Sequence, residues 1–283
     1  MTAKTKRKLT NVLMGTGRAA LLLFFLLIVI LPIYWMFITS FKLPQDITTV
    51  DIQYWPRNFT FDNYTALWHR TPFPFYLRNS LFVSTVSAAI VLVISVMGGY
   101  AMARYSFRMK KVSIMAFLVS QMIPVVLLLI PLFVMINTVN LGDTLTSLIM
   151  LYIVFNTPFC TITMQGFFMN IPTALEEAAE IDGCNKLQML LRVVLPIMLP
   201  AVVAVYIFAF IGAWNELLGA VIFINTELLK TIPVGLNAYI GQFAIAWGEM
   251  SAGGMLAIIP AALMFAFAQK YIVDGLTAGA VKG

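Results

Sequence analysis

Six long apolar segments dominate this sequence and restrict it to very few folds. They cover approximately residues 19–39, 77–103, 112–136, 145–168, 197–224 and 252–273. A bilayer core about 30 Å thick needs roughly 20 helical residues to cross it, so each segment is long enough to span a membrane. Only 11% of the 283 residues are charged and 61% are hydrophobic, whereas a soluble domain has roughly 25% charged residues. We therefore expect an all-α polytopic membrane protein with six transmembrane helices.

The distribution of Lys and Arg predicts the orientation of these helices, because positively charged segments near spans stay on the cytoplasmic side. With the N-terminus inside, thirteen of the 18 basic residues lie in the cytoplasm and five outside. Both termini are then cytoplasmic, with an N-terminal segment 1–18, a transmembrane domain 19–273 and a tail 274–283. The first apolar segment could instead belong to a secretory signal peptide, but it is long and no A-x-A-like site follows it. An uncleaved first span is favoured.

The largest outer loop, residues 41–76, is rich in Pro, Asp, Asn and aromatic residues. It is too short for an independent domain but long enough for short interfacial helices and a docking surface. The sole histidine, His69, lies in this loop and cannot form a metal site alone. Cys160 and Cys184 lack ligand-like neighbours in the sequence, so we interpret them as packing or incidental residues. We expect no metal in this chain.

A charged inner loop, residues 170–196, interrupts the apolar pattern. Thr173 and Glu176 fit a T-x-x-E capping box, which predicts a helix beginning near Thr173. Gly183 is expected to end this helix, since glycine adopts a left-handed cap without steric cost. Four apolar residues follow with the spacing of one helical face: Leu187, Leu190, Leu191 and Val194. The pattern predicts a helix, a hinge and a second helix along the membrane, although an ordinary solvated amphipathic helix has a similar pattern.

Seven positions in this loop carry a more specific signal. The chain reads Glu177-Ala178-Ala179, then Gly183 after three residues, and after nine more Val193 with Leu195-Pro196. This spacing resembles the EAA loop in the membrane subunits of bacterial ATP-binding-cassette (ABC) importers. Val193 stands where the family pattern often has Ile, which is a conservative departure. The resemblance favours a loop that contacts another protein over a simple solvated helix.

Further segments are similar to the sugar-importing branch of these permeases. They are Asn79-Ser80-Leu81, Tyr100-Ala101, Ala103-Arg104, Pro124, Ile130-Pro131-Leu132, Trp214-Asn215-Glu216, Pro233-Val234-Gly235-Leu236 and the tail from Gly275 to Gly283. Over nearly its whole length the chain resembles the maltose-transporter-type second permease subunit. The resemblance implies the type I ABC importer permease fold in a bacterial or archaeal plasma membrane, which is the inner membrane of a Gram-negative cell.

The resemblance also implies the partners: a homologous second permease, a homodimeric or heterodimeric cytoplasmic ATPase and an extracytoplasmic sugar-binding protein. Closure of the ATPases around ATP would move the loop and switch the cavity from inward-facing to outward-facing. The residues implied in ATPase coupling are Glu177, Ala178, Ala179, Asp182, Gly183, Leu195 and Pro196. A further ATPase contact is implied at the C-terminus, through Gly279, Lys282 and Gly283.

The chain itself is not expected to be an enzyme. It contains no GxxxxGK[ST] phosphate loop, so ATP and Mg are expected on the partner ATPase, with no cofactor in this chain. A membrane-embedded enzyme would need a nucleophile, a carboxylate pair or a metal cluster. An ion-coupled secondary transporter would usually show inverted repeats and ion-coupling groups at the midplane, and the sequence has neither. Within the importer architecture, the open substrates are an oligosaccharide or disaccharide, glycerol phosphate, another polyol derivative or a peptide.

Polar residues inside the spans are candidates for the substrate path, because ionisable or amide groups within a membrane are usually functional. The candidates are Gln121, Asn156, Asn215 and Glu216. Glu216 follows Pro200 by about 16 residues, or roughly 24 Å of helix, which places it near the outer boundary. Three roles stay open for its carboxylate: lining the cavity, holding a helix contact or facing interfacial water.

Overall fold

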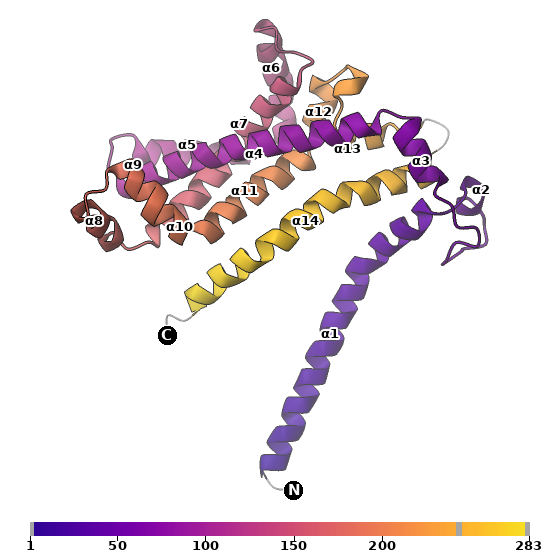
Figure 1. The fold of residues 1–283 in the computed structure, drawn as a ribbon, viewed down its shortest axis with the longest axis horizontal. Coiled ribbons are helices and arrows are strands. Elements are labelled where there is room, and N and C mark those ends of the chain that lie inside the picture. Colours follow the sequence, from indigo (N-terminus) through magenta and orange to yellow (C-terminus); the bar gives the residue numbers. More distant parts are fainter. Residues whose placement is uncertain (1–2, 242–244, 281–283) are drawn as a thin grey trace. The chain divides into compact units, whose positions relative to one another are not determined.

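The computed structural model describes residues 3–241 and 245–280, with side chains described for residues 14–241 and 245–271. In this part of the chain the structure is helical, and the only β pairing is an isolated bridge between Ile240 and Ile245 (Figure 1). The helices form two compact units. One comprises residues 1–71 and 239–256, and the other comprises residues 72–238 and 257–283.

The first unit contains α1 (Ala3–Ser40), α2 (Pro44–Ile47), α3 (Asp62–His69) and the start of α14 (Trp247–Ala280). Asn63 on α3 is buried and donates two 2.9 Å hydrogen bonds, to the carbonyls of Ser40 and Lys42. The ring of Phe41 stacks on Phe59 with centroids 4.4 Å apart. These contacts fold the segment after α1 back onto its end, and short helices occur within the predicted outer loop as expected.

The second unit is organised around α4 (Phe73–Arg104) and α7 (Leu145–Met169), which pack along each other over much of their length. Small residues make this approach possible. A Cβ at Gly99 would lie only 2.8 Å from the Cβ of Met164, and Thr161 donates a 3.3 Å hydrogen bond to Ser95. Against this pair lies α11 (Leu199–Trp214). Close packing at small residues is typical of helices within a membrane.

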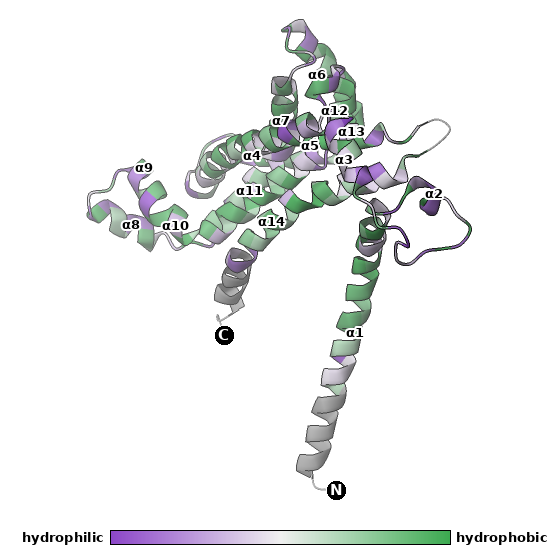
Figure 2. Ribbon diagram, turned by 45° about the vertical axis from the view of Figure 1, so that its right-hand side comes forward, coloured by the Kyte–Doolittle hydropathy of each residue, from purple (hydrophilic) through white to green (hydrophobic). Residues whose placement is uncertain are grey.

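Four continuous helices are long and apolar enough to cross a membrane. They are Met14–Ser40, Phe73–Arg104, Leu145–Met169 and Trp247–Tyr271. Two more spans are possible if each of two bent helix pairs counts as one, which makes six. Figure 2 shows hydrophobic residues along α1 and α11 and hydrophilic residues in the shorter segments between the long helices. The expected spans are thus present, but two of them are not continuous.

The predicted third span, 112–136, consists of α5 (Lys110–Met122) and α6 (Val125–Thr138), which are bent by 104°. Pro124 explains the break. Its ring disfavours helical geometry at the preceding residue, and Ile123 is extended at φ −78°, ψ 124°. Pro131 lies inside α6, and the prolines predicted to interrupt the fourth and sixth spans, Pro158 and Pro260, lie inside α7 and α14, which continue through them.

A single helix over 197–224 was the wrong prediction for the fifth span. The chain forms α11, a non-helical turn at residues 215–217, and then α12 (Leu218–Phe223). On the inner side, residues 186–197 are bent by 86° against α11. The next helix is α13 (Ile232–Asn237), preceded by a short 3-10 turn, η2 (Glu227–Leu229).

Replacing Gly99 with Ala should destabilise the protein, whereas replacing Gly166 with Ala should not. The new Cβ at residue 99 would meet the Met164 Cβ at 2.8 Å and the Gln165 backbone nitrogen at 2.9 Å. We expect a loss of about 1–3 kcal/mol, typical of overpacking. At Gly166 nothing lies within 4 Å, so the midpoint of thermal unfolding in detergent should stay the same or rise slightly. Equal midpoints for the parent and Gly99→Ala would contradict the close packing.

Candidate functional site

The charged inner loop folds into four short helical segments. They are α8 (Ala174–Ile181), α9 (Lys186–Met189), the π-helical turn η1 (Leu190–Val194) and α10 (Leu195–Ile197). The predicted start near Thr173 is confirmed, but the predicted T-x-x-E capping box is wrong. Thr173 has helical angles, φ −63° and ψ −26°, and its side chain forms no capping hydrogen bond. An N-cap residue requires a non-helical backbone, so its hydroxyl does not reach the helix.

Gly183 ends α8 as predicted, with a left-handed φ of +85°. The Gly183 amide donates to the Glu180 carbonyl and the Cys184 amide donates to the Ala179 carbonyl, both at 3.0 Å. This hydrogen-bond pair is the Schellman motif, which satisfies the last carbonyls of a helix. The loop does hold a capping box, but at Asn185 and Gln188, where the N-x-x-Q pattern starts α9.

The four leucine and valine residues predicted on one helical face are divided between two faces. Leu190 and Val194 are buried, whereas Leu187 and Leu191 are exposed. The π-helical turn explains the difference, because its extra residue replaces the regular i, i+4 spacing. Met189 and Val194, five residues apart, are accordingly both fully buried.

The predicted coupling residues differ in their accessibility. Glu177, Ala178, Asp182 and Gly183 are exposed, whereas Ala179 is only 5% exposed and packs against the chain itself. At the start of α10, Leu195 is partly buried and Pro196 exposed. Ile181, which the sequence reasoning missed, is 86% exposed. Its position four residues after Glu177 and three after Ala178 was the available signal, because these spacings share one helical face.

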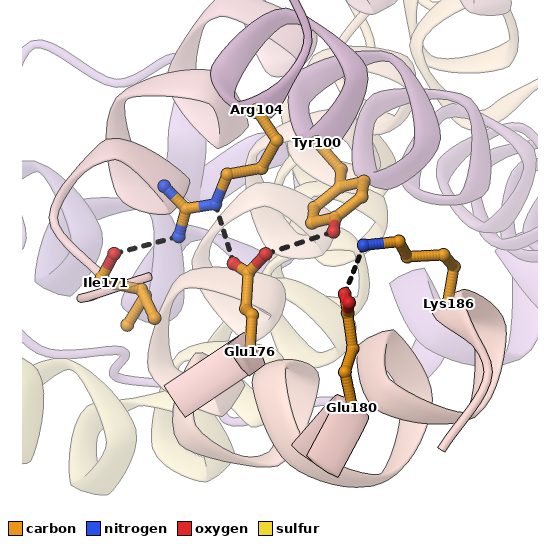
Figure 3. Close-up of polar contacts among 6 residues, drawn as sticks. All are labelled: Tyr100, Arg104, Ile171, Glu176, Glu180 and Lys186. Carbon is orange, nitrogen blue, oxygen red and sulfur yellow. Dashed lines mark hydrogen bonds and ion pairs between the residues drawn. The ribbon is translucent and has the colours of Figure 1, made fainter. Parts of the chain in front are cut away.

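A buried ionic contact attaches the loop to the end of α4 (Figure 3). The Arg104 guanidinium donates from Nε to Glu176 Oε1 at 2.6 Å and from Nη2 to the Ile171 carbonyl at 2.8 Å. The Tyr100 hydroxyl donates to Glu176 Oε2 at 3.1 Å, and Glu176 is only 7% exposed. The sequence marked Arg104 only as a topology charge and a family-like residue, and placed Glu176 in a capping box, so this contact was missed.

A second ion pair in the same loop, between Lys186 and Glu180, is solvent-exposed. The hydrogen bond from Glu180 raises the pKa of the Lys186 ammonium. Exposed pairs of this kind contribute little to stability. Figure 3 shows both pairs at adjacent positions along α8.

Two of the four candidates for the substrate path lie together. Gln121 on α5 and Asn156 on α7 line a hollow of about 600 Å³, together with residues on both sides of the α5–α6 break. Aromatic side chains form much of its wall: Phe117, Phe155, Phe159 and Phe208. The rings of Phe159 and Phe208 stack with centroids 4.2 Å apart. Asn215 and Glu216 do not line this hollow.

Glu216 instead holds a helix contact at the break between α11 and α12. Its carboxylate accepts hydrogen bonds from the amides of Gly219 at 2.7 Å and Ala220 at 3.0 Å, which are the free donors at the start of α12. The Tyr152 hydroxyl on α7 donates to the same carboxylate at 3.1 Å. Asn215 is exposed just after the last residue of α11. Of the three roles left open for Glu216, the geometry favours the second.

The remaining candidates are less defined. Gly279 lies in the last turn of α14, while Lys282 and Gly283 fall outside the described residues. His69 is exposed, Cys160 is buried and Cys184 is partly buried, and both cysteines are free thiols. Across the residues searched there is no group of three or more His, Cys, Asp or Glu side chains able to hold a metal ion.

Residues 95–277 match the family described as "Binding-protein-dependent transport system inner membrane component". This chain belongs to that family. It is a component of the bacterial inner membrane and not an enzyme, and the ATP that drives such importers is handled by a separate ATPase.

Two relatives illustrate how much of the chain the similarity covers. The sulfoquinovosyl glycerol transport system permease protein SmoH of Agrobacterium fabrum is 37% identical over 252 residues, covering 89% of this chain and 88% of SmoH. The inner membrane ABC transporter permease protein YcjP of Escherichia coli is 33% identical over 283 residues, covering 99% of this chain and all of YcjP. The similarity extends well beyond the charged inner loop.

The fold is similar to that of solved importers. A chain of a bacterial ABC transporter involved in the import of the acidic polysaccharide alginate superposes with a TM-score of 0.80 at 22% identity, covering 96% of this chain and 99% of that one. The predicted ABC importer permease fold is confirmed.

Replacing Glu216 with Ala should destabilise the protein because it leaves the Gly219 and Ala220 amides without their partner. We expect a loss of about 1–3 kcal/mol, which is typical of a buried donor left unsatisfied. Asn215→Ala, at the neighbouring exposed position, should change stability by less than about 0.5 kcal/mol. The midpoint of thermal unfolding in detergent measures both. A Glu216→Ala variant that keeps the parent midpoint but loses uptake would show instead that the carboxylate serves the substrate.

Proposed function

We propose that this chain is the permease subunit of an ATP-driven, binding-protein-dependent importer of sugars, either oligosaccharides or disaccharides. In this proposal it forms the translocation path with a homologous second permease and rests on an ATPase dimer. An extracytoplasmic binding protein delivers the sugar, and ATP with Mg binds to the ATPase, with no cofactor in this chain.

The names of the relatives support a sugar substrate. They include permeases for sulfoquinovosyl glycerol, diacetylchitobiose, trehalose and arabinooligosaccharides, each 30% to 37% identical to this chain. The fold alone does not discriminate between substrates, because a methionine ABC transporter also matches it, with a TM-score of 0.55. Glycerol phosphate, another polyol derivative or a peptide are therefore the alternatives within the same architecture.

The observation that carries the proposal is the exposed face of α8. Glu177, Ala178 and Ile181 share one side of a helix held at both ends, and Ile181 is 86% exposed. An apolar side chain of this size on a charged, two-turn helix favours a protein partner, since solvent gains nothing from it. We assign this face to the ATPase, in the cytoplasm, where the distribution of basic residues places the loop. Ala179 contributes by packing the helix onto its own chain.

The hollow beside the α5–α6 break supports a sugar path. Sugar sites combine aromatic faces with hydrogen-bonding groups, and Gln121 and Asn156 supply amides among four phenylalanine rings. Non-helical backbone at membrane depth is tolerated where it lines a cavity or is buried in protein, and residues on both sides of the break line this hollow. We confine the proposed path to Gln121 and Asn156 and leave Asn215 and Glu216 out of it.

The substrate class is tested by the ligand of the cognate binding protein. The binding protein would be purified with its natural ligand, and the ligand released and identified by mass spectrometry. A sugar is the expected result, followed by uptake of that sugar into proteoliposomes that contain the complete transporter and ATP. A bound peptide or glycerol phosphate would contradict the sugar assignment while leaving the architecture in place.

The coupling role predicts different outcomes for two substitutions of Gly183. No atom lies within 4 Å of a Cβ built there, so any effect comes from the backbone at φ +85°. Asn tolerates this conformation, whereas Val is strained by more than the roughly 1–2 kcal/mol that an ordinary L-residue loses there. We expect Gly183→Val to abolish uptake and weaken copurification of the ATPase without affecting membrane insertion, and Gly183→Asn to retain most activity.

A companion variant, Ile181→Asp, tests the surface directly and should also release the ATPase. The same kind of change at exposed Phe107, in the turn between α4 and α5, is the control. Normal uptake and normal ATPase binding by both Gly183→Val and Ile181→Asp would overturn the coupling assignment.

A further inference from the structure

Three segments of the second unit meet at one guanidinium group. Arg104 is the last residue of α4, the Ile171 carbonyl belongs to the turn that follows α7, and Glu176 lies in the first turn of α8. The two hydrogen bonds of Arg104, at 2.6 and 2.8 Å, connect all three segments (Figure 3). The end of the second span is thus attached both to the fourth span and to the helix that we assign to ATPase coupling.

Glu176 is the polar link between α8 and the spanning helices. Among the described side chains of α8, the carboxylate of Glu176 bonds to Tyr100 and Arg104 on α4, and that of Glu180 bonds to Lys186 within the loop. The remaining anchor of α8 is the apolar packing of Ala179. A push on α8 therefore reaches α4 through the Glu176 carboxylate.

Burial makes this link stiff. The side chain of Glu176 is 10% exposed and that of Arg104 is 12% exposed, whereas those of Glu180 and Lys186 are 43% and 61% exposed. Separating two buried charges leaves both uncompensated, and this is strongly unfavourable, while an exposed pair exchanges readily with water. Tyr100 occupies the second carboxylate oxygen, and its ring packs edge-on against Phe168 of α7, with centroids 5.3 Å apart.

We propose that Arg104, Glu176 and Tyr100 form a clamp that transmits movement of α8 to α4, so that the second span follows the ATPases. These three are positioning residues: they touch neither substrate nor nucleotide. The inference rests on the proposed coupling function of the loop. It adds a connection that the chain order does not supply, because only the fourth and fifth spans flank the loop in sequence.

The test separates transmission from folding by removing the polar link without leaving a lone charge. Replacing a buried ion pair by apolar residues of similar size is often neutral or stabilising. The double variant Arg104→Met with Glu176→Leu, reconstituted with the second permease, ATPase and binding protein, should therefore assemble and unfold near the parent temperature. We expect the number of ATP molecules hydrolysed per sugar imported to rise about tenfold, within the range of typical coupling free energies. Tyr100→Phe should produce a smaller rise of the same sign.

Two matched controls lie in the same region of the chain: Arg108→Met and Tyr105→Phe, both at exposed positions. Each should keep the parent ratio of ATP to sugar. A stable, assembled double variant with the parent ratio would overturn the clamp. A double variant that fails to assemble sends the test to Tyr100→Phe, for which an unchanged ratio likewise overturns it. Failure of the clamp is distinct from failure of the coupling site, because the coupling site is judged by ATPase copurification with Gly183→Val and Ile181→Asp.

Discussion

Inside a bilayer no water is available to the peptide groups, and the rest of this structure depends on that constraint. Every N–H and C=O at membrane depth must find a partner within the protein, which is why the described chain is built of helices. Four spans satisfy the constraint along their whole length, and two do not. At the broken fifth span the Glu216 carboxylate supplies the missing acceptor for the Gly219 and Ala220 amides. The polar residue and the irregular backbone at this position explain each other.

The same principle accounts for the loop that faces the aqueous phase. A helix of only two turns has little stability of its own, because nucleation is unfavourable. Here α8 is held by a Schellman motif at Gly183 and by the buried contact of Glu176 with α4. Its outer face is left free to present Ile181. A short helix fixed at both ends, with an apolar residue between, has the form of a part that receives force from another protein.

Comparison of sequence and structure shows where local patterns are sufficient. Apolar length predicted the spans, and Gly183 marked a helix end, because both signals act within a few residues of chain. The capping box failed at Thr173 because Glu176 has a partner on α4, 72 residues earlier, and a local motif contains no information about it. The α11–α12 break was missed because Asn215 and Glu216 interrupt an otherwise apolar run too briefly to mark its end. The hollow that unites Gln121 and Asn156 required the relative placement of α5 and α7.

The bend of 104° at Ile123–Pro124 also bears on how such a protein is made. Pro124 cannot donate to the carbonyl four residues before it, and the bend frees further backbone groups. In lipid these groups are costly, so the unassembled chain is less favourable in the bilayer than one whose bend faces water or another protein. Synthesis of this subunit in excess of its companions would therefore leave a membrane protein with unmatched polar groups, and cellular quality control recognises defects of that kind. The backbone at one proline thereby links the folding of a single chain to the stoichiometry of the whole complex.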